Sequence, residues 1–301
     1  MATIPMLFRA VALLLASLLA WASYAQQPAA EPKTFLWQVT GSGGTAYLFG
    51  TIHLGKPEFY PLPKPVEAAF AKSDVLAVEA DLTKVGNDPA ELARMGMYPP
   101  PDRLEKHISK ELLGNVLEAA ARYNLQMERT VPLKPWVLAS LFVMAESMRA
   151  GYDPAKGVDA YLISQAKAKG KPVIELESVD FQLKLMEGLS PAEQEAFLQG
   201  TLLSLKDRQF KRTLDALEAA WKAGDSKRLE EAAEESQRGL PMAAVLNDKI
   251  VHSRNPALVN KVEQLIASGK IPFVAVGALH LTGSRGMLKL LADKGYQLKQ
   301  Q

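Results

Sequence analysis

Two short apolar segments constrain the fold of this 301-residue chain most, because each ends in a glycine and then presents a histidine. The first reads YLFGTIHLG from Tyr47 to Gly55, and the second reads FVAVGALHLTG from Phe273 to Gly283. Short, almost wholly apolar runs are typical of buried strands in parallel sheets. Ligands of open α/β sheets collect just beyond the carboxyl ends of such strands. The repeated G-x-x-H pattern therefore predicts a sheet edge that carries His53 and His280.

Two glutamates occupy the same kind of position at the ends of two further strand-like runs. Val75–Val78 leads directly into Glu79, and the run Val173–Glu177 ends in a glutamate. Because the carboxyl ends of neighbouring parallel strands meet at one sheet edge, we expect these two glutamates to converge with the two motif histidines. Alternate residues of a strand share a face, so Glu175 and Glu177 are expected to point the same way.

The remaining patterns predict a mostly helical chain around a central mixed sheet. A glycine-rich turn at residues 41–44 separates two strand-like runs, 35–39 and 45–49, which indicates an antiparallel hairpin beside the parallel strands. Apolar spacing of three and four residues, with proline and glycine breaks, predicts the helices. They are expected at residues 66–72, 88–94, 109–124, 135–149, 157–169, 191–238, 242–252, 256–267 and 286–294. The fold class is therefore α/β, with an inserted helical subdomain at about 191–240 that Gly224–Asp225 divides into two helices.

The first 25 residues are typical of an export signal. Arg9 precedes a short apolar run from Ala10 to Ala22, and Ser23-Tyr24-Ala25 is a small-x-small cleavage site. We expect cleavage after Ala25, a flexible leader at residues 26–33, and a single α/β domain over 34–301. The apolar run is shorter than the roughly 20 residues of a membrane span, so no stable membrane insertion is expected after cleavage. An uncleaved anchor is the alternative.

Composition limits the partners and the chemistry. A formal net charge of +2 gives no electrostatic basis for binding nucleic acid or anionic membranes. The chain has no cysteine, so it cannot be a lipoprotein and cannot use thiolates as metal ligands. We find no phosphate-binding glycine loop and no serine or cysteine nucleophile elbow. The expected protein is exported, periplasmic or secreted, and acts on a peptide or small-molecule substrate.

Two imidazoles with one or two carboxylates form a binding site for a divalent transition metal such as Mn, Co or Zn. Three protein ligands leave one position open, and a bound metal makes hydrolysis possible near neutral pH by lowering the pKa of its water. A glycine at each strand exit permits close backbone approach. Arg254 lies in a short loop after His252, where its guanidinium can hold a carboxylate or an oxyanion.

The chain resembles the TraB/GumN family, to which the Tiki-type metalloproteases also belong. The resemblance rests on YLFGTIHLG, on VEADL, on GVD with the later KPVIELES, on SRNPAL and on FVAVGALHLTG. In the characterised proteases of that family, the two motif histidines and a glutamate are linked to metal-dependent peptide cleavage. By motif position, the resemblance implies metal ligands at His53, Glu79 and His280. It also implies a catalytic neighbourhood formed by Glu79, Glu177 and Arg254.

Three functions are compatible with these residues. The favoured one is an exported metal-dependent hydrolase, with a peptidase preferred, in which Glu79 or Glu177 transfers the proton. Which glutamate is the ligand and which is the base stays open. The alternative is a non-catalytic protein of the same fold that binds a peptide or haem. In the third, both histidines are structural and the sheet edge binds nothing.

Overall fold

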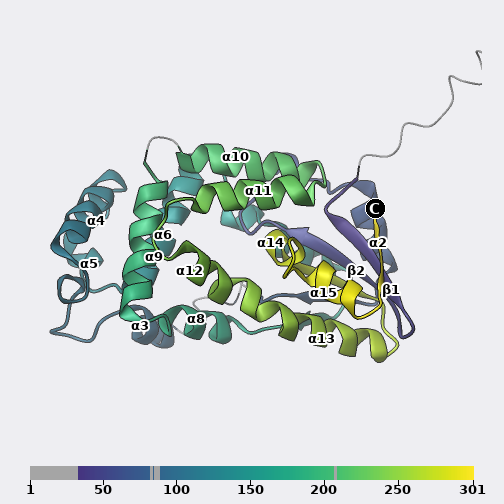
Figure 1. Cartoon of the computed structure of the whole chain (residues 1–301). Helices are drawn as coiled ribbons and strands as arrows, with labels where there is room; N and C mark the ends of the chain where they lie inside the picture. The colour runs from purple at the N-terminus through teal and green to yellow at the C-terminus, as the bar shows by residue number, and fades with distance from the viewer. Residues whose placement is uncertain (1–32, 82–83, 85–88, 207–208) are drawn as a thin grey trace, which may run out of the picture. The chain divides into compact units, whose positions relative to one another are not determined.

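The computed structural model describes residues 33–81, 84, 89–206 and 209–301 (Figure 1). Residues Lys33–Gln301 pack as one unit. The predicted signal peptide at 1–25, and the predicted leader up to residue 32, lie outside the described residues. Both therefore stay predictions.

The described strands form one mixed sheet in the order β4-β3-β5-β2-β1-β6. Neighbouring strands in the series β4, β3, β5 and β2 pair in parallel, whereas β1 pairs antiparallel with β2 and β6. The strands are Leu36–Gly41 (β1), Gly44–Thr51 (β2), Val75–Val78 (β3), Val173–Glu175 (β4), Pro272–Gly277 (β5) and Gln297–Gln300 (β6). The predicted mixed sheet, with its hairpin and parallel strands, is confirmed.

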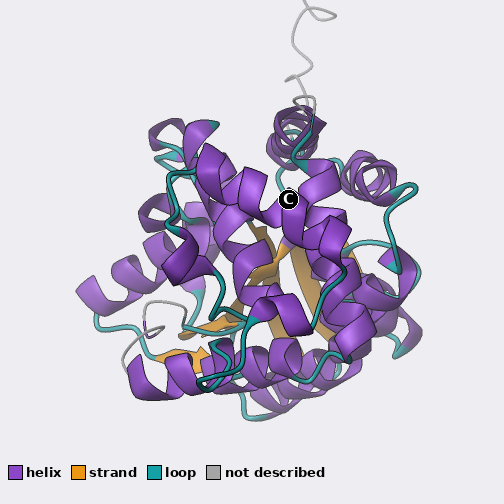
Figure 2. Cartoon of the chain, turned by 90° about the vertical axis from the view of Figure 1, so that its left-hand side faces the viewer, coloured by secondary structure: helices purple, strands orange, loops and turns teal. Residues whose placement is uncertain are grey.

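Helices cover the sheet, as Figure 2 shows with purple helices around the orange strands. They are α2 (Lys64–Lys72), α3 (Pro89–Gly96), α4 (Lys110–Arg122), α5 (Met127–Thr130), α6 (Pro135–Arg149), α7 (Val158–Ala168), α8 (Val179–Glu187), α9 (Pro191–Ser204), α10 (Gln209–Lys222), α11 (Ser226–Gln237), α12 (Ala243–Ile250), α13 (Asn255–Ala267), α14 (Ala278–Leu281) and α15 (Met287–Asp293). The predicted α/β class, with a mostly helical chain around the sheet, is confirmed. Among the described residues, no helix is both long and apolar enough to span a membrane.

The apolar runs that predicted β3 and β5 are apolar because both faces of these central strands are covered. Every residue of β3 is buried, and so are the first five of β5. The ring centroid of Phe273 on β5 lies 5.4 Å from that of Phe70 on α2 and 5.9 Å from that of Phe49 on β2. Burial on this scale is the main favourable contribution to folding, and it fixes the edge from which the functional side chains project.

Helix α10 is anchored on the first G-x-x-H segment through Trp221. The indole Nε1–H donates to the carbonyl of Gly50 at 2.7 Å, and this contact is buried. The ring centroid of Trp221 lies 5.2 Å from that of Phe59 and 6.2 Å from that of Phe49. Helix α10 is therefore part of the same hydrophobic core as the first G-x-x-H segment, although the two are far apart in the sequence.

The prediction of two helices over residues 191–238 is wrong, because three helices form there. Helix α9 ends at Ser204, and α10 and α11 follow. Leu198 and Leu202 of α9 pack with Phe142 of α6 in a separate apolar cluster, whereas Leu214 and Leu217 of α10 pack against the core of the sheet. One straight helix cannot pack against both the α6 cluster and the core of the sheet. The apolar spacing of the sequence nevertheless continues from α9 into α10, so it does not mark the break.

Strand β4 ends at Glu175, two residues earlier than predicted. Ser178 caps α8 by accepting a hydrogen bond from the Phe181 N–H, so the chain has already turned towards that helix at Glu177. The carboxylate of Glu175 accepts from the backbone N–H of Asp81 at 2.8 Å, while Glu177 bonds Arg254. The prediction that the strand extends to Glu177 is therefore wrong, and the two glutamates bind different partners.

Candidate functional site

The carboxyl ends of β2, β3 and β5 lie side by side at one edge of the sheet. The strand registers pair Thr51 with Gly277, and Val78 with Ala275. The residues that follow these three strands therefore emerge together, as the sequence predicts. They include the two histidines of the G-x-x-H motifs and the glutamate that follows β3.

A cavity of about 290 Å³ lies at this edge and contains most of the predicted site residues. The predicted residues that line it are His53, Glu79, Arg254 and His280. Glu177 is not among its lining residues, and it lies behind the guanidinium of Arg254, which it binds. The five side chains are therefore brought together, but only four face the cavity.

Glu79 is a buried carboxylate whose two oxygens have different surroundings. Oε1 accepts from the Gln182 amide at 2.8 Å and from Arg254 Nη2. Oε2 accepts from the Gly277 N–H at 3.2 Å and lies 3.5 Å from His280 Nε2. Burial opposes ionisation, but the hydrogen bond and charge of His280, with the charges of His53 and Arg254, hold the pKa of Glu79 well below its usual range. Glu79 thus remains charged, with Oε2 directed towards the histidine.

Arg254 holds two carboxylates at once. Its Nε donates to both oxygens of Glu177 at 3.1 Å, and Nη2 donates to Glu177 and Glu79. Nη1 donates to the carbonyl of Ile250 at 2.7 Å. The side chains of Arg254 and Glu79 are 8% and 7% exposed, so this is a buried ion cluster. Of the two roles that the sequence suggests for Arg254, holding a carboxylate is the one that these contacts match.

His53 is fixed through its Nδ1. This atom lies 2.8 Å from Oδ2 of Asp159, and Oδ1 of the same carboxylate accepts from the Thr51 hydroxyl at 2.6 Å. The charge of Asp159 raises the pKa of His53 to about 9. Because Nδ1 donates to Asp159, Nε2 is the ring nitrogen that remains for a ligand.

His280 is fixed in the same manner by a neutral partner. Its Nδ1 lies 2.6 Å from Oδ1 of Asn255, a fully buried side chain. The amide nitrogen of Asn255 donates to the carbonyl of Arg285 at 2.8 Å, so Oδ1 is the end that accepts. Nδ1 of His280 therefore carries a hydrogen, and Nε2 is the ring nitrogen that faces Glu79.

Gly277 lies between these donors, and the missing side chain leaves them room. A Cβ at Gly277 would lie 3.4 Å from His53 Nε2, 3.6 Å from Glu79 Oε2 and 3.6 Å from His280 Cδ2. Ligands at about 2.0–2.2 Å from a tetrahedral ion lie about 3.3–3.6 Å from each other, which the 3.5 Å between His280 Nε2 and Glu79 Oε2 matches. No group of three such side chains among the described residues is close enough as it stands to hold an ion. The donor types fit a divalent cation.

Substitution of Gly277 by alanine is expected to block cation binding without unfolding the protein. Gly277 has φ −49°, which alanine adopts, and its new contacts of 3.4–3.6 Å are of ordinary length. The methyl group would nevertheless occupy the space between the donors. Titration with Zn²⁺ should show an affinity at least about 10-fold weaker, while thermal unfolding shifts by less than about 2 °C. Gly114→Ala, whose methyl group would meet nothing within 4 Å, is the control; equal affinities in both variants would contradict the assignment.

Asp159 and Asn255, the side chains that orient the two histidines, were not among the predicted site residues. Asp159 stands in the first turn of α7, where an acidic residue is explained by the helix dipole alone. Asn255 begins α13 directly after Arg254. Both lie within the segments GVD and SRNPAL that carry the family resemblance, which is the only signal that singled them out.

Curated proteins similar to this chain include YbaP of Escherichia coli K12, which is 29% identical over 249 residues, covering 81% of this chain and 87% of YbaP. YbaP of Shigella flexneri is 29% identical over 250 residues, covering 82% and 87% respectively. Both are described as uncharacterised. Metalloprotease TIKI2 of Danio rerio is 25% identical in an alignment of 324 residues. The alignment covers 89% of this chain and 61% of TIKI2. No solved structure matches the chain.

A family model covers almost everything that the structure describes. The model of the TraB/PrgY/gumN family matches residues 35–300, from the start of β1 to the end of β6. Both G-x-x-H motifs, the buried ion cluster and the helices over the cavity fall inside this match. The chain therefore belongs to the TraB/PrgY/gumN family.

Proposed function

We propose that this protein is an exported metal-dependent hydrolase, and specifically a peptidase, that works at the edge of the sheet. One observation supports this most strongly: His53 and His280 each bond a polar side chain through Nδ1, which leaves Nε2 of His53 beside Gly277 and Nε2 of His280 beside Oε2 of Glu79. Histidines that bind metals almost always donate their other ring N–H in this way. The similarity to TIKI2, which is named a metalloprotease, supports the same function.

The residues proposed to hold the cation are His53, His280 and Glu79, through Nε2, Nε2 and Oε2. The set of two imidazoles and one carboxylate suits Mn, Co or Zn. A cation bound there would polarise a carbonyl and activate water for attack. The chain's own groups then have to orient the substrate and move the proton.

Of the two glutamates, we assign the cation ligand to Glu79 rather than to Glu177. Glu79 is the one of these two glutamates that lines the cavity, and its Oε2 faces the histidines. Arg254 holds the other oxygen of Glu79, and Glu177 holds Arg254, so both act as positioning residues. A carboxylate that is fixed through one oxygen keeps the second available to bind the cation.

The proposal is tested with purified protein of residues 26–301, which lacks the predicted signal peptide. We expect one divalent metal per chain by elemental analysis, and hydrolysis of a mixed peptide library by mass spectrometry. A chelator should abolish hydrolysis, and Mn²⁺, Co²⁺ or Zn²⁺ should restore it. Peptide or haem binding without turnover by the metal-loaded protein would instead support the non-catalytic alternative.

Replacement of Asp159 by asparagine is expected to weaken metal binding by about 10- to 100-fold. Asparagine keeps the shape of the side chain but removes the charge that holds the Nδ1 hydrogen of His53. The measurement is a metal titration of the chelator-treated protein. Asp102→Asn is the matched control, because Asp102 lies 2.8 Å from His107 in an exposed pair outside the cavity. Unchanged affinity in Asp159→Asn would argue against His53 as a ligand.

A further inference from the structure

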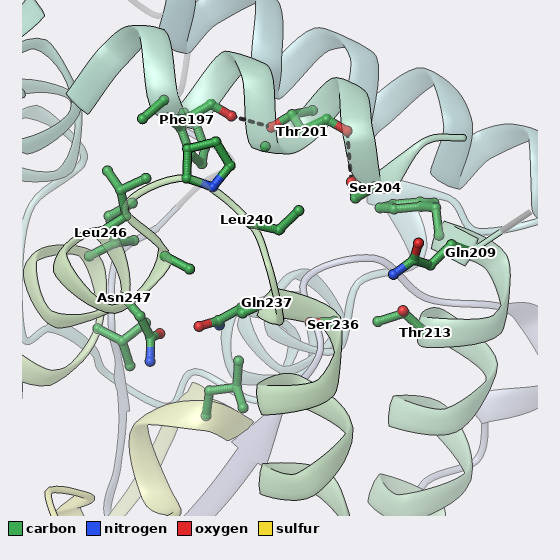
Figure 3. A pocket seen from close by; sticks show the side chains of 18 residues that line it. Phe197, Thr201, Ser204, Gln209, Thr213, Ser236, Gln237, Leu240, Leu246 and Asn247 are labelled. Carbon is green, nitrogen blue, oxygen red and sulfur yellow. Dashed lines mark hydrogen bonds between the residues drawn. The ribbon is translucent and has the colours of Figure 1, made fainter. Parts of the chain in front are cut away.

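A second cavity, of about 330 Å³, lies beside the candidate metal site between α9, α10, α11 and α12 (Figure 3). None of the 18 residues that line it carries a charge. Its apolar wall includes Phe197, Phe210, Leu240, Pro241 and Leu246. Cavities of about 300–1,000 Å³ are typical of ligand sites, so this one is large enough to hold part of a substrate.

The two cavities are neighbours that share part of their lining. Ile250, Val251 and Leu279 line both of them. Leu279 directly precedes His280 on α14, so the helix that positions the second histidine also forms the shared wall. The second cavity therefore lies beside the residue that precedes His280, so it is the space next to a ligand bound at that histidine.

Three hydroxyl groups in the second cavity are already satisfied by the protein. Thr201 donates to the carbonyl of Phe197 at 2.9 Å, and Ser204 donates to that of Thr201 at 2.7 Å. Ser236 donates to the carbonyl of Ala233 at 2.7 Å. Because their hydrogens are engaged within their own helices, these side chains add little polarity to the cavity.

Two amide side chains remain available to a ligand. Figure 3 shows Gln209 and Gln237 directed into the cavity, and within the described part of the chain neither side chain forms a hydrogen bond. A hydrocarbon chain would displace water from these two amides without offering them a hydrogen bond, which is unfavourable. The backbone of a peptide offers both N–H and C=O groups to them. The cavity therefore matches a peptide segment better than an acyl chain.

We propose that this second cavity binds the segment of a peptide substrate next to the bond that is cleaved, and that it selects neutral residues with bulky apolar side chains. The selection for apolar residues follows from the walls of the cavity. Selection against Lys, Arg, Asp and Glu follows from the absence of charge among the described residues that line it, because a charged side chain would lose its hydration there without gaining a partner among them. The inference rests on the proposed function and names the substrate class of the same site.

Peptide binding to the metal-free protein tests the inference separately from catalysis. The probes are three short, blocked, fluorescent peptides of Gly, Ala and Ser that carry a central Leu-Phe, Lys-Phe or Glu-Phe pair. Fluorescence anisotropy should give a Kd for the Leu-Phe peptide at least about 10-fold lower than for the two charged peptides. Dodecanoate, a plain hydrocarbon chain with a carboxylate, should compete weakly.

A charge placed in the cavity should change this preference. Gln237→Glu alters one atom of the side chain and adds a negative charge to the neutral lining. We expect it to tighten binding of the Lys-Phe peptide and to reduce the ratio between the Leu-Phe and Lys-Phe affinities by at least about 10-fold. Gln264→Glu, the same change at an exposed position on α13 outside both cavities, is the matched control and should leave the ratio unchanged.

The outcomes separate this inference from the proposed function. Equal affinities for the three peptides, or an unchanged ratio in Gln237→Glu, would overturn the inference even if the loaded protein cleaves peptides. Dodecanoate binding that is tighter than that of the Leu-Phe peptide would also overturn it, in favour of a lipid-like ligand. Selective peptide binding without any metal-dependent cleavage would support the inference and contradict the peptidase.

Discussion

Replacement of either motif histidine by alanine is expected to lower kcat/KM for peptide hydrolysis by at least about 10³-fold, because the loss of one of three ligands removes the cation that activates water. His53→Ala and His280→Ala should both lose stoichiometric metal on elemental analysis. His53→Ala is the cleaner variant, since the side chain of His53 is 47% exposed and its removal leaves the core intact. In His280→Ala the buried Asn255 loses its partner, so thermal unfolding has to be measured alongside activity.

The matched control for both variants is His107→Ala. His107 pairs with Asp102 at 2.8 Å and stacks on Tyr98, with ring centroids 4.0 Å apart, but it does not line the cavity. Its removal should leave metal content and kcat/KM within about 2-fold of the parent protein. Full cleavage of a validated peptide by His53→Ala would rule out the proposed site.

Replacement of Arg254 by methionine is expected to lower the free energy of unfolding by about 3–5 kcal/mol. The substitution keeps much of the side-chain volume but leaves the carboxylates of Glu79 and Glu177, each 7% exposed, buried without their cation. Urea unfolding of the metal-free protein measures the change, because a bound metal would itself compensate Glu79. Adding Glu177→Gln to the variant should recover part of the loss by removing one of the unpaired charges.

Arg285→Met provides the comparison for this loss. Arg285 also pairs with a carboxylate, that of Asp248, but the two side chains are 54% and 43% exposed. Exposed ion pairs contribute about 0–1 kcal/mol. Similar losses in the two variants would show that the buried cluster around Arg254 is not what stabilises this edge of the sheet.

The sequence predicts much of the arrangement because strand ends leave a local signal. Apolar runs that stop at Gly50 and Gly277, or lead into Glu79, identify the strands and the edge where they meet. Their parallel pairing in the structure confirms the fold class, while the roles of the side chains remain predictions.

The orienting side chains lack such a signal, because their partners are distant in sequence. Asp159 meets His53 across 106 positions, and Asn255 meets His280 across 25. Nothing local distinguishes Asp159 from an ordinary acidic residue in the first turn of a helix. The boundary between α9 and α10 is hidden for a related reason: apolar spacing records that a residue is buried, not which surface it is buried against.

The bond from Trp221 to Gly50 restricts how a substrate enters. If the paired helices α10 and α11 swung outwards as a hinged cover, the indole would leave its aromatic pocket and the Gly50 carbonyl would lose its partner inside the core. Such a swing would leave two buried polar groups without their partners, so it is disfavoured. Under the proposed function, a substrate therefore has to enter without an outward swing of these two helices.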